Sequence, residues 1–318
     1  MYVKSRRGFM LPDLKSSAVP EVSGRIRRMK LSDTIAKYIF LFCAMISIFT
    51  TIGIILSLVT DSVGFFSKVS IIEFLTGTEW TPLFSDPRFG ILPLITGTLI
   101  VTVGAGIIAI PVGLLSAIYL SEYAHPKVRQ VLKPTLEILA GIPSIVYGFF
   151  ALTFITPTLK SFIPNVEVFN ALSASIAVGI MTIPLVSSLS EDALRAVPDS
   201  LRHGALALGA TKLEMTLKVI VRAAISGISA SFVLAVSRAI GETMIVAVAA
   251  GAKPTFTLDP RQSVQTMTAF IVQVSQGENP HGTISYYSLY AVGLVLFILT
   301  LGLNILSHYI VNKYREEY

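Results

Sequence analysis

The sequence predicts an all-α integral membrane protein that crosses the bilayer about six times. Hydrophobic residues make up 53% of the 318 positions and charged residues only 14%, whereas soluble domains carry about 25% charged residues. Several apolar runs are long enough to cross the hydrocarbon layer, which takes roughly 20 residues in a helix. A chain this apolar cannot cover itself with water-soluble surface, so lipid is its expected solvent.

Six apolar runs define the expected spans. The first, at 35–60, is longer than the apolar core of a signal peptide, which has roughly 7–15 residues, so we expect it to be retained. It follows a basic tail, 1–34, that we expect to be flexible, and it precedes a loop at 61–90 in which Trp80 suits a membrane interface. A five-helix core is expected over 91–311, followed by a short tail at 312–318. Its spans are expected at about 91–120, 134–158, 171–189, 223–251 and 287–311.

The basic residues orient these spans. With both termini in the cytoplasm, the cytoplasmic segments hold nine Lys and Arg up to Lys37, three at 127–133, five at 195–222 and two at the C-terminus. The other side holds five, and Arg238 lies within a span. Because Lys and Arg accumulate on the cytoplasmic side of membrane proteins, we expect both termini, and the loop at 190–222, to be cytoplasmic, and the loop at 61–90 to be extracytoplasmic.

Small residues recur at every fourth position in two of the spans, which places them on one face of each helix. Close backbone approach stabilises helix pairs in lipid, so these faces are expected to pack against neighbouring helices. The alternative is that Ala and Gly are simply common in membrane spans. Pro111, Pro143 and Pro184 are expected to kink their spans. The two series are Ala105, Ala109, Gly113, Ala117 and Ser121, and Ser231, Ala235, Ala239, Thr243, Ala247 and Gly251.

Two charged residues lie inside the fifth apolar run. Arg238 is near its middle and Glu242 follows one helical turn later. A charge at the bilayer centre costs about 2.5–3.5 kcal/mol on insertion scales, so both are expected to face a neighbouring helix or a wet cavity. Four-residue spacing places them on one helix face, where they can pair. They are therefore either a structural ion pair or part of an anion pathway, in which Arg238 attracts the anion and Glu242 holds it or is displaced by it.

The loop at 190–222 carries helix signals. Pro198 and Asp199 are typical of a helix start, and Leu201, Ala205 and Leu208 form an apolar stripe at helical spacing. Gly209 is expected to end this helix because glycine adopts positive φ readily. Thr211 and Glu214 then form a capping box that starts a second helix. A rigid helix of this kind suits docking to a soluble partner, or it lies on the lipid headgroups.

Several functional classes lack support in the sequence. Cys43 is the single cysteine and the four histidines are scattered, so neither a disulfide nor a metal site is expected. There is no GxxxxGK[ST] loop for ATP, no HExxH and no GxSxG, so no catalytic residue or cofactor is expected. The net charge of +6 follows the membrane topology rather than a nucleic-acid surface.

The stretch RHGALALGATKLEMTLKVIV, residues 202–221, resembles the EAA loop of ABC importer permeases, which docks onto the ATPase subunit. Ala205 and Gly209 match that pattern at the family spacing. His203 stands where glutamate is usual and Gly204 where alanine is usual, and Arg222 replaces a proline. The resemblance implies that His203, Gly204, Ala205 and Gly209 couple this chain to an ATPase, without the contact that the glutamate would make.

Four further stretches resemble the permeases of phosphate-specific (Pst) importers, over most of residues 85–312. The long N-terminal tail and the loop containing Trp80 are more similar to PstC-type than to PstA-type permeases. The stretches are GILPLITGTL, EILAGIPSIVYGFF, SRAIGETM and LFILTLGLN.

This resemblance implies the type I ABC importer permease fold and half of an alternating-access pore in a bacterial or archaeal cytoplasmic membrane. The implied partners are a second, PstA-type permease, two cytoplasmic ATPase subunits and an extracytoplasmic phosphate-binding protein. Arg238 and Glu242 fall where intramembrane charges line the phosphate path in that family. A PstA-type role and a permease for another oxyanion remain alternatives, and a secondary anion transporter is a more remote one.

Overall fold

The computed structural model describes residues 19–84, 86–277, 280 and 282–313. The predicted tails at 1–18 and 314–318 lie outside these described residues. The chain divides into two compact units, Met1–Ser57 and Leu58–Tyr318.

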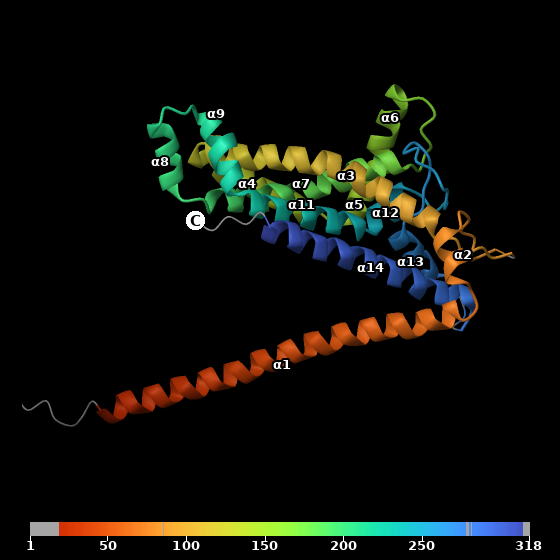
Figure 1. Cartoon of the computed structure of the whole chain (residues 1–318), viewed down its shortest axis with the longest axis horizontal. Coiled ribbons are helices and arrows are strands. Elements are labelled where there is room, and N and C mark those ends of the chain that lie inside the picture. The colour runs from red at the N-terminus through yellow and green to blue at the C-terminus, as the bar shows by residue number, and fades with distance from the viewer. Residues whose placement is uncertain (1–18, 85, 278–279, 281, 314–318) are drawn as a thin grey trace, which may run out of the picture. The chain divides into compact units, whose positions relative to one another are not determined.

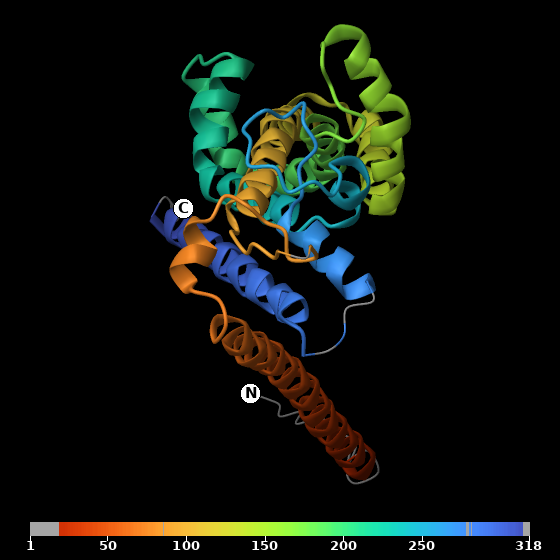
Figure 2. The ribbon, with the colours of Figure 1, turned by 90° about the vertical axis from the view of Figure 1, so that its right-hand side faces the viewer.

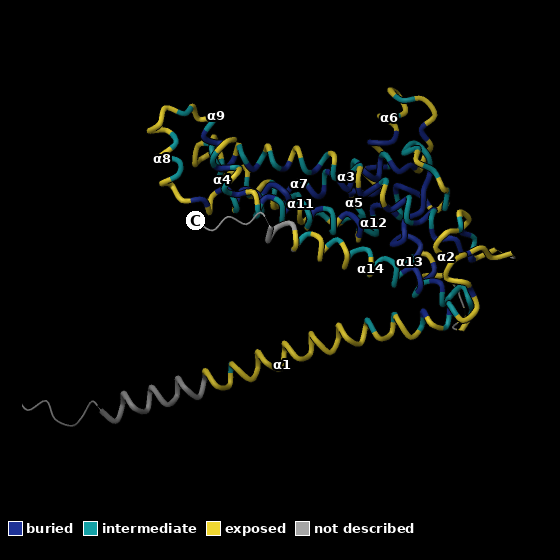
Figure 3. The backbone as a smooth tube through the Cα atoms, viewed as in Figure 1, coloured by how far each residue is buried: buried dark blue, intermediate teal, exposed yellow. Residues whose placement is uncertain are grey.

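The described part of the first unit is helical. Helix α1 (Val19–Phe66) contains the candidate membrane span Asp33–Phe66, and the side chains from Asp33 to Ser57 are nearly all exposed (Figure 3). Residues 19–34, which the sequence placed in a mostly flexible tail, are helical in the structure.

Helices dominate the second unit as well (Figure 1). In the described part of the chain, five helices are long and apolar enough to cross a membrane, or six if one bent pair is counted as a span, which agrees with the predicted number. The helices after α1 are α2 (Ile71–Thr76), α3 (Leu92–Ile118), η1 (Tyr119–Tyr123), α4 (Pro126–Ala140), α5 (Ser144–Phe150), η2 (Ala151–Ile155), α6 (Thr156–Phe162), α7 (Ala171–Arg195), α8 (Asp199–Ala207), α9 (Lys212–Glu214), η3 (Met215–Ile220), α10 (Val221–Ala223), α11 (Ile225–Ile240), α12 (Met244–Ala249), α13 (Met267–Gln276) and α14 (Ile284–Lys313).

Helices α3 and α7 form the centre of this unit. Figure 2 shows them beside each other, with the yellow-green α4 to α6 on one side and the teal α8 to α10 on the other. Both helices continue through their internal prolines, Pro111 and Pro184. A Cβ on Gly113 would lie 2.6 Å from the Cβ of Val186, so only glycine permits this approach. The predicted packing face is confirmed for Ala105, Ala109, Gly113 and Ala117, which are all buried in α3. Its last member, Ser121, lies in η1 and is half-buried.

The third span begins later than predicted. The sequence suggested a helix over 134–158, but α4 ends at Ala140 and a separate span covers Ser144–Phe162. Pro143 explains the interruption, since proline has no N–H to donate and disfavours helical geometry at Ile142. Helix α4 has no buried residue, and its mixed apolar and basic composition differs from that of the spans.

The fifth span is also interrupted. The sequence suggested one helix over 223–251, but α11 ends at Ile240 and α12 begins at Met244. At the other end of α11, the segment Lys212–Ala223 meets Ile225–Ile240 at an angle of 72°. Ser231, Ala235 and Ala239 are buried on α11, which confirms the first half of its predicted small-residue face.

An aromatic cluster lies at the α2 end of this unit. Trp80 is buried and contacts Phe270 of α13 edge-on, with ring centroids 4.9 Å apart. Phe65, Phe74 and Phe89 complete the cluster. Trp80, which suits a membrane interface, is thus enclosed by protein: Phe74 and Phe89 come from nearby segments and Phe270 from a distant one.

Candidate functional site

Arg238 and Glu242 lie on either side of the end of α11. Because the helix stops at Ile240, they are not one turn apart on a continuous helix, and no ion pair joins these two described residues. The structural ion pair, one of the two alternatives, is therefore not formed between them. Their part in an anion pathway remains a prediction.

Glu242 stabilises the break between α11 and α12. Its Oε1 accepts hydrogen bonds from the backbone N–H groups of Met244 and Ile245, at 3.1 and 3.2 Å. Its carbonyl oxygen accepts the Thr268 hydroxyl at 2.7 Å. A carboxylate at a helix N-terminus satisfies free N–H groups and interacts favourably with the helix dipole. The half-buried Glu242 thus fastens both α12 and the neighbouring α13.

Arg238 occupies the last turn of α11 and is exposed in the isolated chain. The residue before it, Ser237, donates a hydrogen bond to Oδ1 of Asn304 on α14, at 3.1 Å. The residue after it, Ala239, is buried in the core. The backbone of Arg238 is therefore held at a fixed position along α11, and its guanidinium, which has five N–H donors, forms no ion pair with the described residues.

The loop after α7 folds as predicted, into two helices joined by a glycine turn. Pro198 precedes α8, Gly209 has φ +84°, and Thr211 and Glu214 form the capping box. The N–H of Ala210 donates to the carbonyl of Ala205 and closes the turn. We call residues 198–214 the helical hairpin.

The helical hairpin presents its turn outward (Figure 3). Leu201 and Ala205 pack against the apolar cluster formed by α7, η3 and α11. Leu208, which the sequence placed on the same stripe, does not reach that cluster and is 91% exposed. His203 and Gly204 are exposed on the same helix. An apolar side chain this exposed, on a rigid turn, suits insertion into a groove of a partner protein.

Arg202 fastens the helical hairpin to the spans. Its Nη2 lies 3.0 Å from Oε1 of Glu122 in η1 and donates to the carbonyl of Leu194 in α7 at 2.8 Å. Its Nη1 donates to the carbonyl of Val197 at 2.6 Å and forms an ion pair with Asp199. Hydrogen bonding to Glu122 raises the pKa of Arg202 above its ordinary value. The side chains of Arg202 and Glu122 are only 17% and 5% exposed.

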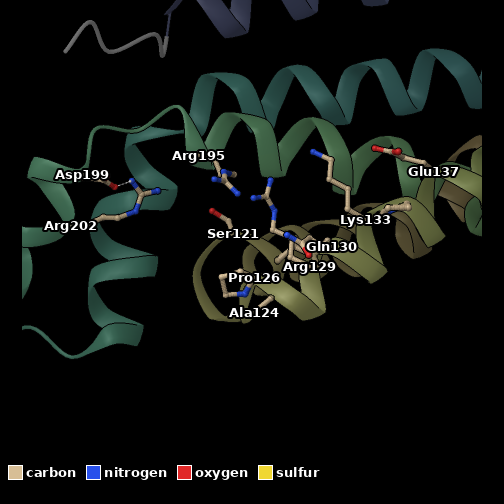
Figure 4. A pocket seen from close by; sticks show the side chains of 12 residues that line it. Ser121, Ala124, Pro126, Arg129, Gln130, Lys133, Glu137, Arg195, Asp199 and Arg202 are labelled. Carbon is tan, nitrogen blue, oxygen red and sulfur yellow. Dashed lines mark hydrogen bonds and ion pairs between the residues drawn. The ribbon is translucent and has the colours of Figure 1, made fainter.

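A second charged network joins α4 to α7. Glu191, whose side chain is fully buried, lies 2.6 Å from Arg129, 3.0 Å from Lys133 and 4.0 Å from Arg195. Burial lowers the pKa of Lys133, but its contacts with Asp192 and Glu191 outweigh that effect, so its pKa is raised. Figure 4 shows Arg129 and Lys133 from α4 and Arg195 from α7 around one pocket. The pocket has a volume of about 720 Å³.

The predicted residues thus fall into two groups on different parts of the structure. Arg238 and Glu242 belong to the α11–α12 break, whereas His203, Gly204, Ala205 and Gly209 belong to the helical hairpin. Arg202 and Glu191 were not singled out from the sequence. Arg202 pairs with Glu122, 80 residues away, and Glu191 pairs with Arg129, 62 residues away. No local sequence pattern predicts these two pairs.

Comparison with known proteins places these features in a family. Residues 109–316 match the family described as "Binding-protein-dependent transport system inner membrane component". The probable ABC transporter permease protein YqgH of Bacillus subtilis is 33% identical over 96% of this chain and 99% of its own length. The phosphate transport system permease protein PstC of Haemophilus influenzae is 31% identical over 77% of this chain and 82% of its own.

Solved structures agree on the fold. A chain of a bacterial ABC transporter that imports alginate superposes with a TM-score of 0.59 at 14% identity, over 93% of this chain and 98% of that one. A chain of the MetNI methionine ABC transporter superposes with a TM-score of 0.53 at 18% identity, over 71% of this chain and 95% of that one.

Proposed function

This chain belongs to the binding-protein-dependent transport system inner membrane component family, and from that premise we propose that it is a PstC-type permease of an ATP-driven phosphate importer. Phosphate is proposed as the substrate because the chain is similar to PstC permeases, such as that of Haemophilus influenzae, at 31% identity over 77% of this chain. The chain would sit in a bacterial or archaeal cytoplasmic membrane, with both termini and the helical hairpin in the cytoplasm. It would form half of the pore.

The proposed partners follow from the family and from the resemblance of the sequence. They are a second, PstA-type permease, two ATPase subunits and an extracytoplasmic phosphate-binding protein. The alginate transporter has been solved with an alginate-bound periplasmic protein, which supports such an arrangement. ATP hydrolysis would take place on the ATPase subunits, since the sequence has no phosphate-binding loop of its own.

The helical hairpin is proposed to dock on an ATPase subunit. Leu208 is the most exposed apolar side chain of the hairpin. The surface around Leu208 is formed by His203, Gly204, Ala205 and Gly209. Arg202 binds the ends of both η1 and α7, so a displacement of α8 would move the two central helices with it. Glu191 would pass the same displacement on to α4.

Arg238 is proposed to meet the phosphate inside the pore. A guanidinium matches an oxyanion because it donates parallel hydrogen bonds to two oxygens. Arg238 has no carboxylate ion-pair partner among the described residues, so its charge would be available in the cavity between the two permeases. Glu242 is proposed to line the same path while its carboxylate holds α12 in position.

Uptake measurements test the proposal. Cells lacking their own phosphate importers would express this chain with its partner subunits, and uptake of labelled phosphate, sulfate and molybdate would be compared. We expect phosphate uptake that ends when the ATPase subunit carries an inactivated nucleotide site. Uptake of sulfate or molybdate in place of phosphate would favour another oxyanion permease. Phosphate uptake that survives without the ATPase would favour a secondary transporter.

A further inference from the structure

A polar pocket beside Glu191 has no ligand assigned to it in the proposed transport mechanism. It lies between α4, the end of α3 and the junction of α7 with α8, and Arg129, Lys133, Arg195 and Arg202 line it together with Glu137 and Asp199. The buried Glu191 and Glu122 stand behind this lining, with side chains 0% and 5% exposed. A ligand in the pocket would therefore meet the cations before it met those two carboxylates.

The cations keep donors free for a ligand. Arg129, Lys133 and Arg195 share the single charge of Glu191, and only Lys133 has a further carboxylate, the exposed Asp192. Arg195 makes the longest of these contacts, at 4.0 Å, and about half of its side chain is exposed. Each guanidinium has five N–H donors. Arg129 and Arg195 can thus add hydrogen bonds to an anion without releasing Glu191.

An apolar groove adjoins the pocket. It has a volume of about 430 Å³, runs between α3 and α4, and is lined by Leu115, Tyr119, Leu132 and Leu136. Leu120 lines both the groove and the pocket. On α4, Leu132 and Leu136 are one turn apart and face the groove, whereas Arg129 and Lys133 are one turn apart and face the pocket.

Helix α4 has the character of a helix that lies at a membrane surface. Val131 and Ile138 are among its exposed apolar residues, and none of its residues is buried. Lys127, Arg129 and Lys133 are its basic residues. Basic amphipathic helices lie in the interface and attract anionic lipids, and basic pockets between helices at the cytoplasmic surface bind phospholipid headgroups.

We propose that the pocket and the groove together bind one anionic phospholipid. Its phosphate would lie among Arg129, Lys133 and Arg195, and an acyl chain would lie along Leu132 and Leu136. A free phosphate ion would use the same cations, but it would leave the adjoining apolar groove unfilled. Continuity between the charged and apolar parts therefore favours a lipid. Such a lipid would bridge α4 and α7 beside the helical hairpin.

Native mass spectrometry of the purified full chain, with any subunits that co-purify, tests this proposal. The protein in detergent would be mixed with phosphatidylglycerol, with phosphatidylcholine or with phosphatidylglycerol plus millimolar inorganic phosphate. We expect one tightly retained phosphatidylglycerol, little phosphatidylcholine and no displacement by inorganic phosphate. Arg195→Gln should weaken retention about tenfold, the equivalent of one charge-assisted hydrogen bond. Leu136→Trp, which fills the groove, should weaken it as well.

Two control variants lie away from the pocket. Lys253→Gln removes an exposed cation, and Leu258→Trp enlarges an exposed leucine in the same loop; both should retain the lipid as the wild type does. Equal retention of phosphatidylcholine, or of phosphatidylglycerol by Arg195→Gln, would overturn the charged part of the proposal. Displacement by inorganic phosphate would identify a free-anion site, and unchanged retention by Leu136→Trp would show that no acyl chain lies in the groove. Either result would overturn the lipid proposal. Either variant decides the question if the other fails to fold.

Discussion

Arg202 in α8 and Glu122 in η1 form a nearly buried ion pair, 3.0 Å apart, between residues 80 positions distant in sequence. The same guanidinium binds the carbonyls of Leu194 and Val197, where α7 ends. One side chain therefore joins the helical hairpin to two central helices. Since the hairpin is the proposed ATPase contact, this pair is the place where ATPase movement would enter the membrane domain.

We expect Arg202→Gln to uncouple ATP hydrolysis from transport. The substitution leaves Glu122 buried without its charge partner, which typically costs about 3–5 kcal/mol, and it frees α8 from α7. Thermal unfolding should shift to lower temperature, and phosphate uptake per ATP hydrolysed should fall. The measurement pairs a thermal-shift assay with uptake and ATPase rates in proteoliposomes.

Lys218→Gln is the matched control. Lys218 forms an exposed ion pair with Glu214 on the next turn of helix, a type that contributes about 0–1 kcal/mol. Lys218→Gln should leave the unfolding temperature, and the phosphate taken up per ATP hydrolysed (the coupling ratio), near the wild-type values. If Arg202→Gln and Lys218→Gln gave equal coupling ratios, Arg202 would have no special role in transmission.

Leu208 should contribute to ATPase binding in proportion to its exposed apolar area. Burying a leucine in an interface stabilises the complex by about 1.5–3 kcal/mol, so we expect Leu208→Asp to reduce co-purification of the ATPase at least tenfold. The control is Leu258→Asp, at an 83% exposed leucine in the 250–266 loop. ATPase yield after affinity purification is the measurement, and equal yields for the two variants would remove Leu208 from the contact.

Glu242 permits a test that separates its capping role from its charge. Loss of an N-terminal capping side chain costs about 1 kcal/mol, so Glu242→Ala should destabilise the protein and reduce uptake. Glu242→Gln keeps an oxygen for the N–H groups of Met244 and Ile245 and should retain stability. Uptake by the Gln variant then reports on the charge alone. Stability of Glu242→Ala equal to wild type would show that the cap contributes nothing.

Arg238→Gln should abolish phosphate uptake and leave assembly intact. The variant keeps a polar side chain but loses the charge that an oxyanion requires. Because Arg238 makes no ion pair with the described residues, its substitution leaves no described carboxylate without its ion-pair partner. Lys253→Gln, which removes an exposed cation in the 250–266 loop, serves as the comparison. Subunit stoichiometry and uptake are measured together, and normal uptake by Arg238→Gln would exclude the proposed phosphate contact.

Local signals in the sequence predicted the helical hairpin correctly. Pro198, Gly209 and the capping box at Thr211 and Glu214 each determine the backbone within a few residues, so no distant contact was needed. The interruption at Pro143 was visible in the same way, but the apolar run across it suggested a continuous span. The apolar run alone therefore placed the start of the third span too early.

Long-range contacts account for what the sequence did not predict. The break at 241–243 depends on Glu242, which caps α12 and accepts the Thr268 hydroxyl from α13. Trp80 contacts Phe74 and Phe89 nearby in sequence, and α13 adds Phe270 from a distant segment. In the sequence, Glu191 resembles any other polar residue near the end of a span. Its partners Arg129 and Lys133 are identified only in the structure, where α4 lies beside α7.

Gly204 and Gly209 make a final comparison within the helical hairpin. A Cβ added at either position would meet nothing within 4 Å, so crowding does not distinguish them. Gly204 lies inside α8, where alanine is favoured over glycine by about 1 kcal/mol, and Gly204→Ala should raise the unfolding temperature. Gly209 has φ +84°, a conformation that costs a residue with a side chain about 1–3 kcal/mol. Gly209→Ala should lower the unfolding temperature and weaken ATPase co-purification, and Gly209→Asn, whose side chain tolerates this conformation, should recover much of both. Shifts of the same sign for the two alanine variants would contradict the positive φ at Gly209 and the turn that presents Leu208.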